Sequence, residues 1–182
     1  MPVETQLKIE YMKVNELSKN EYSSFNATYI NAFGDLGLIE GLENGLNQLV
    51  SFMQTIPIEK LEYRYAENKW TIKDILLHLI DAERIFAYRA LRIGRGDKTP
   101  LAGFEENDYV PNAMANSRTL ESLITEFQFV RNSTLSLFKN FSNEQFLFLG
   151  ISSGNSISVR AIGFIISGHQ NHHLRIIRER YL

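Results

Sequence analysis

Histidines are the residues of this chain whose type and spacing could do chemistry, and three of the four lie close together, at His169, His172 and His173. In a helix, residues four apart lie on one side, one turn apart. His169 and His173 therefore have the geometry with which two imidazoles bind one metal ion. The apolar stripe of this segment includes both, whereas His172 lies beside it. We predict that His169 and His173 face inward, and that His172 is an outer contact of the site or a surface residue.

The remaining histidine, His78, supplies the third ligand of the predicted site. It follows Ile75 by three residues and precedes Ala82 by four in an apolar segment, so it faces the interior of a helical fold. Three neutral imidazoles in an apolar core are costly without a partner, and a divalent metal ion supplies one. Three protein ligands leave an open position for water, as in catalytic sites. The alternative is a set of hydrogen-bonded core histidines.

The elements that must position these histidines are helices. Four segments repeat apolar residues with the 3.6-residue period of an amphipathic helix: 35–54, 70–94, 117–140 and 158–182. Thr71 with Asp74, and Ser158, are predicted to cap the second and fourth of these helices. Because no convincing alternating strand is present, we predict an all-α four-helix bundle.

The long polar connection 94–117 is predicted to be the crossover that lets two neighbouring helices run parallel. Residues 1–34 are predicted to form a partly helical arm packed on the bundle, or else a surface extension. Residues 35–182 are predicted to form the bundle itself, within a single domain overall. The glycine- and serine-rich segment 150–156 is predicted to be a turn.

The composition of the chain argues against several classes of function. The 182 residues are 44% hydrophobic and 22% charged with a net charge of −2, so the chain shows no general attraction to nucleic acid or anionic membrane. The absence of cysteine excludes disulfides, thiolate catalysis and cysteine-based metal sites. The N-terminal sequence does not resemble a secretory signal, and no apolar run reaches the ~18 residues of a membrane span. These features favour a cytoplasmic protein.

Two acidic residues follow His78 on its helix. Asp81 lies about 60° around the helix from His78. It is predicted to accept an imidazole N–H or to pair with Arg84 at the surface. Glu83 points away from His78, and is predicted to bond to another helix or to the N-terminal arm.

Arg131 lies on the apolar stripe of the third helix, and a buried arginine needs an anion. This anion could be a substrate carboxylate, or a carboxylate of the chain such as Asp81 or Glu105. The acidic segment 105–109 is predicted either to rim the site or to be a solvated loop. No paired carboxylates, phosphate-binding loop or Ser–His–Asp arrangement stands out in the sequence.

The histidine motifs resemble those of the DinB/YfiT-like superfamily of metal-dependent enzymes. The shared pattern is Trp70, the sequence HLIDAE that begins at His78, and the sequence GHQNHHL that begins at Gly168. The likeness extends from about residue 36 to the end. It implies a four-helix bundle with a long crossover, and zinc or nickel bound by His78, His169 and His173. It also implies a homodimer, because bundles of this family often pair through helix faces.

Two functions follow from the site and the resemblance. The first is a mononuclear metal-dependent enzyme that acts on a small-molecule substrate. It would be a hydrolase, or a transferase of low-molecular-weight thiols with a thiol as its cofactor. The alternative is a non-catalytic metal-binding or stress-response module. That alternative predicts a fourth protein ligand and no pocket at the metal.

Overall fold

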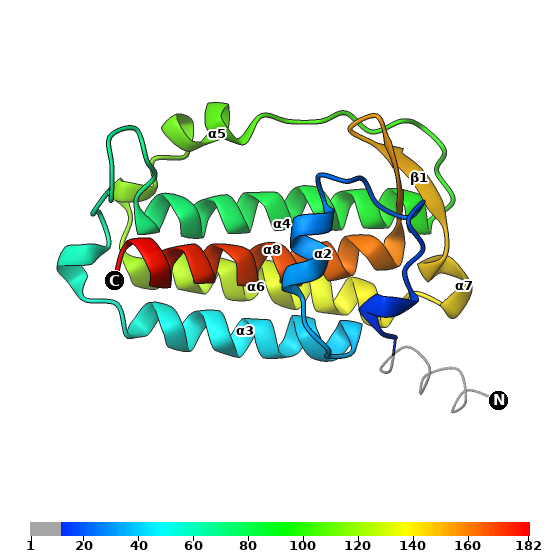
Figure 1. Cartoon of the computed structure of the whole chain (residues 1–182), viewed down its shortest axis with the longest axis horizontal. Helices are drawn as coiled ribbons and strands as arrows, with labels where there is room; N and C mark the ends of the chain where they lie inside the picture. Colours follow the sequence, from blue (N-terminus) through cyan, green and yellow to red (C-terminus); the bar gives the residue numbers. More distant parts are fainter. Residues whose placement is uncertain (1–11) are drawn as a thin grey trace.

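The computed structural model describes residues 12–182 and is built around four long helices that lie side by side (Figure 1). They are α3 (Leu38–Gln54), α4 (Ile72–Gly94), α6 (Leu120–Lys139) and α8 (Val159–Arg180). Helix α8 packs against α3 and α4, and α6 also packs against both. Figure 1 shows that α4 and α6 run in one direction and that α3 and α8 run in the other. The predicted four-helix bundle is confirmed.

Local sequence signals set the ends of the helices that carry the histidines. The Thr71 side chain accepts a hydrogen bond from the Asp74 backbone N–H, and Asp74 accepts one from the Thr71 N–H. Ser158 caps α8 by accepting a hydrogen bond from the backbone N–H of Ala161. Both predicted caps are confirmed, and they satisfy backbone donors that a helix leaves unpaired at its start.

The connection between α4 and α6 runs back along the whole bundle, which makes it the predicted crossover (Figure 1). It contains more regular secondary structure than the polar connection that the sequence predicts. It contains helix α5 (Glu106–Ala113) and the short 3-10 helix η3 (Ala115–Ser117). A further 3-10 turn, η2 (Ile58–Lys60), lies between α3 and α4.

The segment predicted as a simple turn forms a β-hairpin instead. Strands β1 (Leu149–Ser152) and β2 (Asn155–Ser158) pair antiparallel, with Gly150 opposite Ile157. Ser153 and Gly154 both have positive φ, as the tight turns of hairpins require. The short helix α7 (Asn143–Phe146) precedes the hairpin, so the fold is mostly helical with one two-stranded sheet.

The described part of the N-terminal region packs on the bundle. It contains the 3-10 turn η1 (Val14–Glu16) and helix α2 (Ala27–Ala32), which lies across α8 (Figure 1). Met12, Ile30 and Phe33 are buried against the core. Residues 12–34 therefore pack on the bundle, and the part of the predicted arm at residues 1–11 lies outside the described residues.

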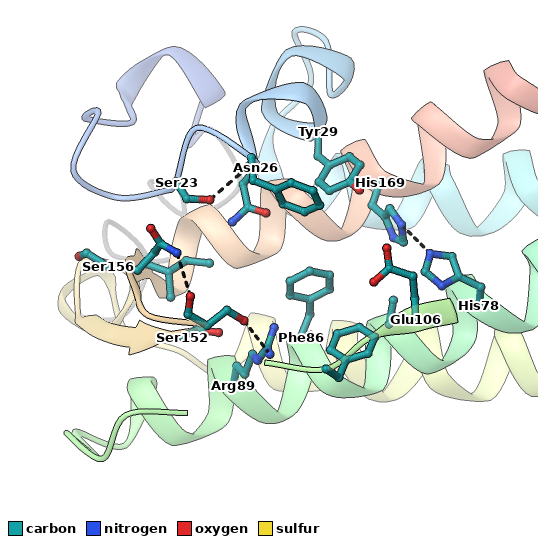
Figure 2. Close-up of a pocket in the computed structure, with 16 residues that line it drawn as sticks. Ser23, Asn26, Tyr29, His78, Phe86, Arg89, Glu106, Ser152, Ser156 and His169 are labelled. Atoms are coloured by element: carbon teal, nitrogen blue, oxygen red, sulfur yellow. Dashed lines mark hydrogen bonds between the residues drawn. The ribbon is translucent and has the colours of Figure 1, made fainter. Parts of the chain in front are cut away.

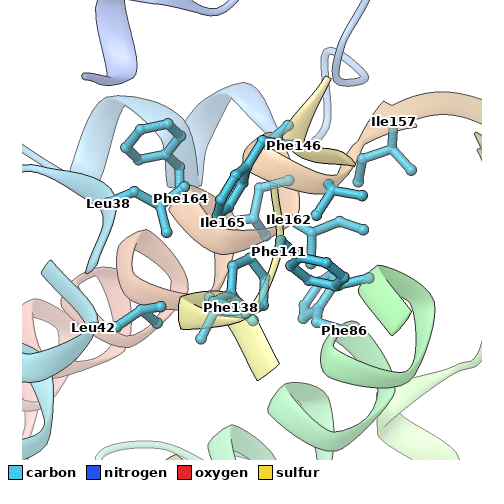
Figure 3. Close-up of a cluster of buried hydrophobic side chains, with 14 of the residues drawn as sticks. Leu38, Leu42, Phe86, Phe138, Phe141, Phe146, Ile157, Ile162, Phe164 and Ile165 are labelled. Carbon is cyan, nitrogen blue, oxygen red and sulfur yellow. The ribbon is translucent and has the colours of Figure 1, made fainter. Parts of the chain in front are cut away.

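Two apolar clusters fill the two ends of the bundle. Figure 3 shows one of them, where Phe138, Phe141 and Phe146 meet Ile162 of α8. The other gathers around Leu76, Phe127 and Ile177. Between the two clusters lies a buried polar layer, made of Gly45, Glu83, Arg131, His169 and Gln170. Among residues 12–182, no helix has both the length and the apolar character that crossing a membrane requires.

Candidate metal centre

The three histidines of the sequence prediction meet where α4 and α8 lie side by side. The Nε2 atom of His169 is 3.0 Å from Nε2 of His78 and 3.0 Å from Nε2 of His173. Each histidine offers one nitrogen to a cluster whose atoms all lie within 4.8 Å of one another. Figure 2 shows the His78 and His169 rings facing each other across the two helices. These residues could hold a metal ion, and their role as ligands stays a prediction.

Burial keeps all three imidazoles neutral, which is the form that binds a metal ion. It lowers the pKa of His78 to about 4. Burial, together with charge repulsion from His78 and His172, lowers the pKa of His173 to about 3. His169 is the most deeply buried, and its pKa lies well below the usual value for the same reasons. The site therefore presents three nitrogen lone pairs at neutral pH.

The spacing of the nitrogens suits a small divalent cation. Two imidazole nitrogens at about 2.0–2.1 Å from a tetrahedral zinc ion lie about 3.3 Å apart. The two 3.0 Å separations here are close to that value. Each neutral imidazole has one N–H group and one nitrogen lone pair, and one N–H can donate to only one facing lone pair. Three neutral imidazoles that converge are therefore better satisfied when their nitrogens bind a cation. The Nδ1 atom of His173 has no hydrogen-bond partner among the described residues, so no carboxylate there orients its ring.

Aromatic side chains hold the histidine rings. Trp70 lies 4.8 Å from the His78 ring centroid and stacks at 6.4 Å on His173. Tyr29 of α2 packs its ring edge-on against His169 at 4.8 Å and against His172 at 5.6 Å. Tyr29 could not be assigned to the site from the sequence, because helix α2 reaches the histidines through its packing on α8.

His172 lies outside the histidine cluster, as its position beside the apolar stripe predicts. It is half-buried, and its Nδ1 atom is 3.4 Å from the Arg175 guanidinium. Burial and the charge of Arg175 both lower the pKa of His172. It contacts the site through its ring, which packs against Tyr29 and His173.

The structure decides between the alternatives for Asp81 and Arg131. Asp81 is half-buried and pairs with Arg84 at 3.5 Å, which is the alternative of a pair with Arg84. Arg131 pairs with Glu83 at 2.8 Å. Its partner is therefore a carboxylate of the chain, as one alternative predicts, although the residue is neither of the two examples named from the sequence. Glu83 does bond to another helix, as predicted.

A cavity of about 330 Å³ opens onto one side of the histidine cluster (Figure 2). His78 and His169 line it, whereas His173 is not among the residues of its wall. Helices α2, α4 and α8, the start of α5 and the hairpin all contribute walls. Of the acidic segment 105–109, Glu106 lines this cavity, and Figure 2 shows its carboxylate beside the two histidines. The prediction that this segment rims the site is thus confirmed for Glu106.

The geometry and the comparisons agree on the family. The chain belongs to the DinB superfamily, whose family model matches residues 42–177. Its fold also matches a solved structure, YfiT from Bacillus subtilis, described as "a probable metal-dependent hydrolase with an unusual four-helix bundle topology". The TM-score is 0.71 at 15% identity, over 94% of this chain and 95% of that one. No curated protein matches the sequence. The resemblance drawn from the histidine motifs is confirmed.

Proposed function

We propose that this protein is a metal-dependent hydrolase of a small molecule, in which His78, His169 and His173 bind one divalent ion, zinc or nickel. The observation that carries the proposal is the convergence of three imidazole nitrogens beside a cavity that two of these histidines line. A divalent ion held by three imidazoles lowers the pKa of a water molecule and polarises a substrate oxygen. YfiT, which shares the fold, carries a description of the same reaction class.

The residues around the cavity have separate roles in this proposal. Phe86, Phe104 and Tyr29 exclude bulk water from the substrate, which strengthens electrostatic interactions inside the cavity. Glu106 accepts the proton of the attacking water, because its carboxylate lies beside His78 and His169 without a hydrogen-bond donor among the described residues. Trp70 and Tyr29 fix the histidine rings in their facing orientation.

The cavity also bears on the two other functions that the sequence leaves open. A non-catalytic metal site would have a fourth protein ligand and no pocket. The described residues contribute three histidines to the cluster, and a cavity adjoins it, so these observations favour an enzyme. Transfer of a small thiol would use the same residues, with Glu106 accepting the thiol proton in place of a water proton.

Metal analysis of the natively purified full-length protein tests the proposal. We expect one zinc or nickel ion per chain, loss of that ion in His169→Ala, and retention in the matched variant His172→Ala. The metal-loaded protein is then assayed with 4-nitrophenyl esters, alone and with small thiols. Stoichiometric metal in His169→Ala would overturn the ligand assignment. Turnover that requires a thiol would identify a transferase, and bound metal without any turnover would identify a non-catalytic module.

A further inference from the structure

Arg89 of α4 is a buried cation without a carboxylate partner. Its side chain is 5% exposed, and it forms no ion pair with any of residues 12–182. The other buried charged side chains in this part of the chain are each paired, as Glu21–Arg160, Lys73–Glu62, Asp74–Arg64 and Glu83–Arg131. A buried charge is costly unless an opposite charge compensates it. Arg89 is therefore the exception that needs an explanation.

The contacts of Arg89 use only part of its hydrogen-bonding capacity. Its Nη2 atom donates to the carbonyl oxygen of Ala102 at 2.8 Å and to Ser153 Oγ at 3.3 Å. Its Nε and Nη1 atoms have no acceptor among the described residues. The guanidinium carbon lies 5.7 Å from the ring centroids of both Phe86 and Phe104. Burial lowers the pKa of Arg89, and the hydroxyl group of Tyr109 partly opposes this shift.

Arg89 lines the same cavity as the histidines, at its other end. His78 and Arg89 are eleven residues apart on α4, which places them about 20° apart around the helix and about 16 Å apart along it. Ala82 and Phe86 lie between them on the same face, and Figure 2 shows Phe86 between Arg89 and the histidines. Because helical side chains lean toward the N-terminus, Arg89 leans toward His78. The cavity thus has histidines at one end, apolar side chains in the middle and the Arg89 guanidinium at the other end.

Resting on the proposed function of the histidine cluster, we propose that Arg89 binds the carboxylate of an elongated substrate whose reacting bond lies at the histidine end. One guanidinium compensates one negative charge, which suits a carboxylate. A phosphate monoester carries about −1.5 to −2 charges at neutral pH and would remain undercompensated. The middle of the cavity, lined by Ala82, Phe86 and Phe104, suits an alkyl or aryl spacer.

The hydrogen bonds of Arg89 also suggest a structural role, in which it ties the crossover to the hairpin. That role explains the contacts of Nη2 with Ala102 and Ser153. It does not explain a full charge, because a neutral donor could make both bonds without the cost of burying a cation. Ligand binding and fold stability must therefore be measured separately.

Calorimetric titration of the full-length protein with 4-phenylbutanoate and with 4-phenylbutanamide tests the proposal. The two probes share a shape and differ in charge. We expect the carboxylate to bind at least about tenfold more tightly than the amide, which corresponds to about 1.4 kcal/mol. This preference should persist after the metal is removed with a chelator. It should be lost in Arg89→Gln and retained in part in Arg89→Lys.

The controls separate this site from the metal site. His169→Ala should lose metal and still prefer the carboxylate, so failure of the hydrolase proposal would leave this result intact. Circular dichroism and thermal unfolding check that the Arg89 variants fold. If Arg89→Gln does not fold, two other results test the proposal. They are the preference of the chelated wild-type protein for the carboxylate over the amide, and the same preference in Arg89→Lys. Equal binding of the two probes, a preference that survives in Arg89→Gln, or tighter binding of 4-phenylbutyl phosphate would overturn the proposal.

Discussion

Glu83 and Arg131 face each other through two parallel hydrogen bonds in the middle of the bundle. Arg131 Nε donates to Glu83 Oε1 at 2.8 Å, and Nη2 donates to Oε2 at 2.9 Å. Arg131 also donates to the carbonyl of Leu42 and to Gln170 Oε1, so the pair joins α4 and α6 to α3 and α8. Because Gln170 is the neighbour of His169, this network fixes the rotation of α8 at which His169 faces His78.

Replacing Glu83 should therefore be strongly destabilising. In Glu83→Gln the charge of Arg131, which is 1% exposed, remains buried without an anion. Loss of one partner of such a pair costs about 3–5 kcal/mol. Urea unfolding monitored by circular dichroism measures this loss. The matched variant Asp81→Asn breaks the outer pair with Arg84 and should change stability by only about 0–1 kcal/mol. Equal effects of the two variants would contradict a structural role for the buried pair.

Features with a local cause were predictable from the sequence. The caps at Thr71 and Ser158 follow from side chains that bond to the next turn of backbone. The inward direction of His169 and His173 follows from their place on an apolar stripe. The partner of Arg131 was not predictable. It depends on how α4 and α6 are rotated against each other, and the carboxylates considered from the sequence were Asp81 and Glu105, not Glu83.

Features that depend on contacts between distant segments were also missed. Strands of four residues are too short to show an alternating pattern, so the hairpin at 149–158 reads as a turn. Helix α2 is only six residues long, and its packing on α8 brings Tyr29 to the site. Arg89 lies on the widely apolar helix α4, and its lack of an anion becomes evident only once its surroundings are known.

Trp70 should report metal binding by its fluorescence. It is the single tryptophan of the chain, and its ring packs on His78 and His173. Adding nickel to the chelated protein should quench the emission, with saturation at one ion per chain. Loss of a residue that only supports a metal ligand lowers metal affinity by about 10–100-fold. In His173→Ala a ligand itself is lost, so the metal affinity should fall by more than this. His172→Ala should titrate like the wild type. An unchanged titration in His173→Ala would show that the ion binds elsewhere.

Gly168, the residue before His169, is required where α8 passes the backbone of α2. A Cβ atom at this position would lie 1.9 Å from the carbonyl oxygen of Tyr29, and backbone cannot move aside as a side chain can. Gly168→Ala should therefore destabilise the protein by about 1–3 kcal/mol and displace Tyr29 from the cavity wall. Thermal unfolding and metal affinity measure the two effects. The neighbouring Ser167→Ala removes a buried hydroxyl without a partner among the described residues, so it should be neutral or slightly stabilising.

Because Glu21 pairs with residues of α8, the free energy of unfolding should depend on pH in the acid range. Burial opposes ionisation of Glu21, but hydrogen bonds from Arg160, the Ser18 backbone and Ser158 lower its pKa below the usual 4.5. The ionised carboxylate therefore stabilises the folded protein above pH 4.5, and this contribution is lost as the pH falls through the lowered pKa.

Glu21→Gln should accordingly be less stable than the wild type at neutral pH, by about 2–4 kcal/mol for a largely buried pair. The difference should shrink in acid, as the wild-type carboxyl becomes protonated. Urea unfolding across this pH range measures the convergence. Glu16→Gln is the control, because Glu16 is half exposed and lies 4.0 Å from Arg160. A constant difference between wild type and Glu21→Gln at all pH values would contradict the linkage.

Glu106 should be required for turnover and dispensable for metal binding. Its carboxylate lines the cavity beside His78 and His169, where it can take a proton from an attacking water. Loss of a general base lowers rates by about 10²–10⁴-fold, so Glu106→Gln should lose that much kcat on the ester found to be a substrate. The control is Asp108→Asn, which removes an exposed carboxylate from the same helix and should retain activity. Loss of metal in Glu106→Gln would instead make Glu106 a ligand, and full activity would exclude it as the base.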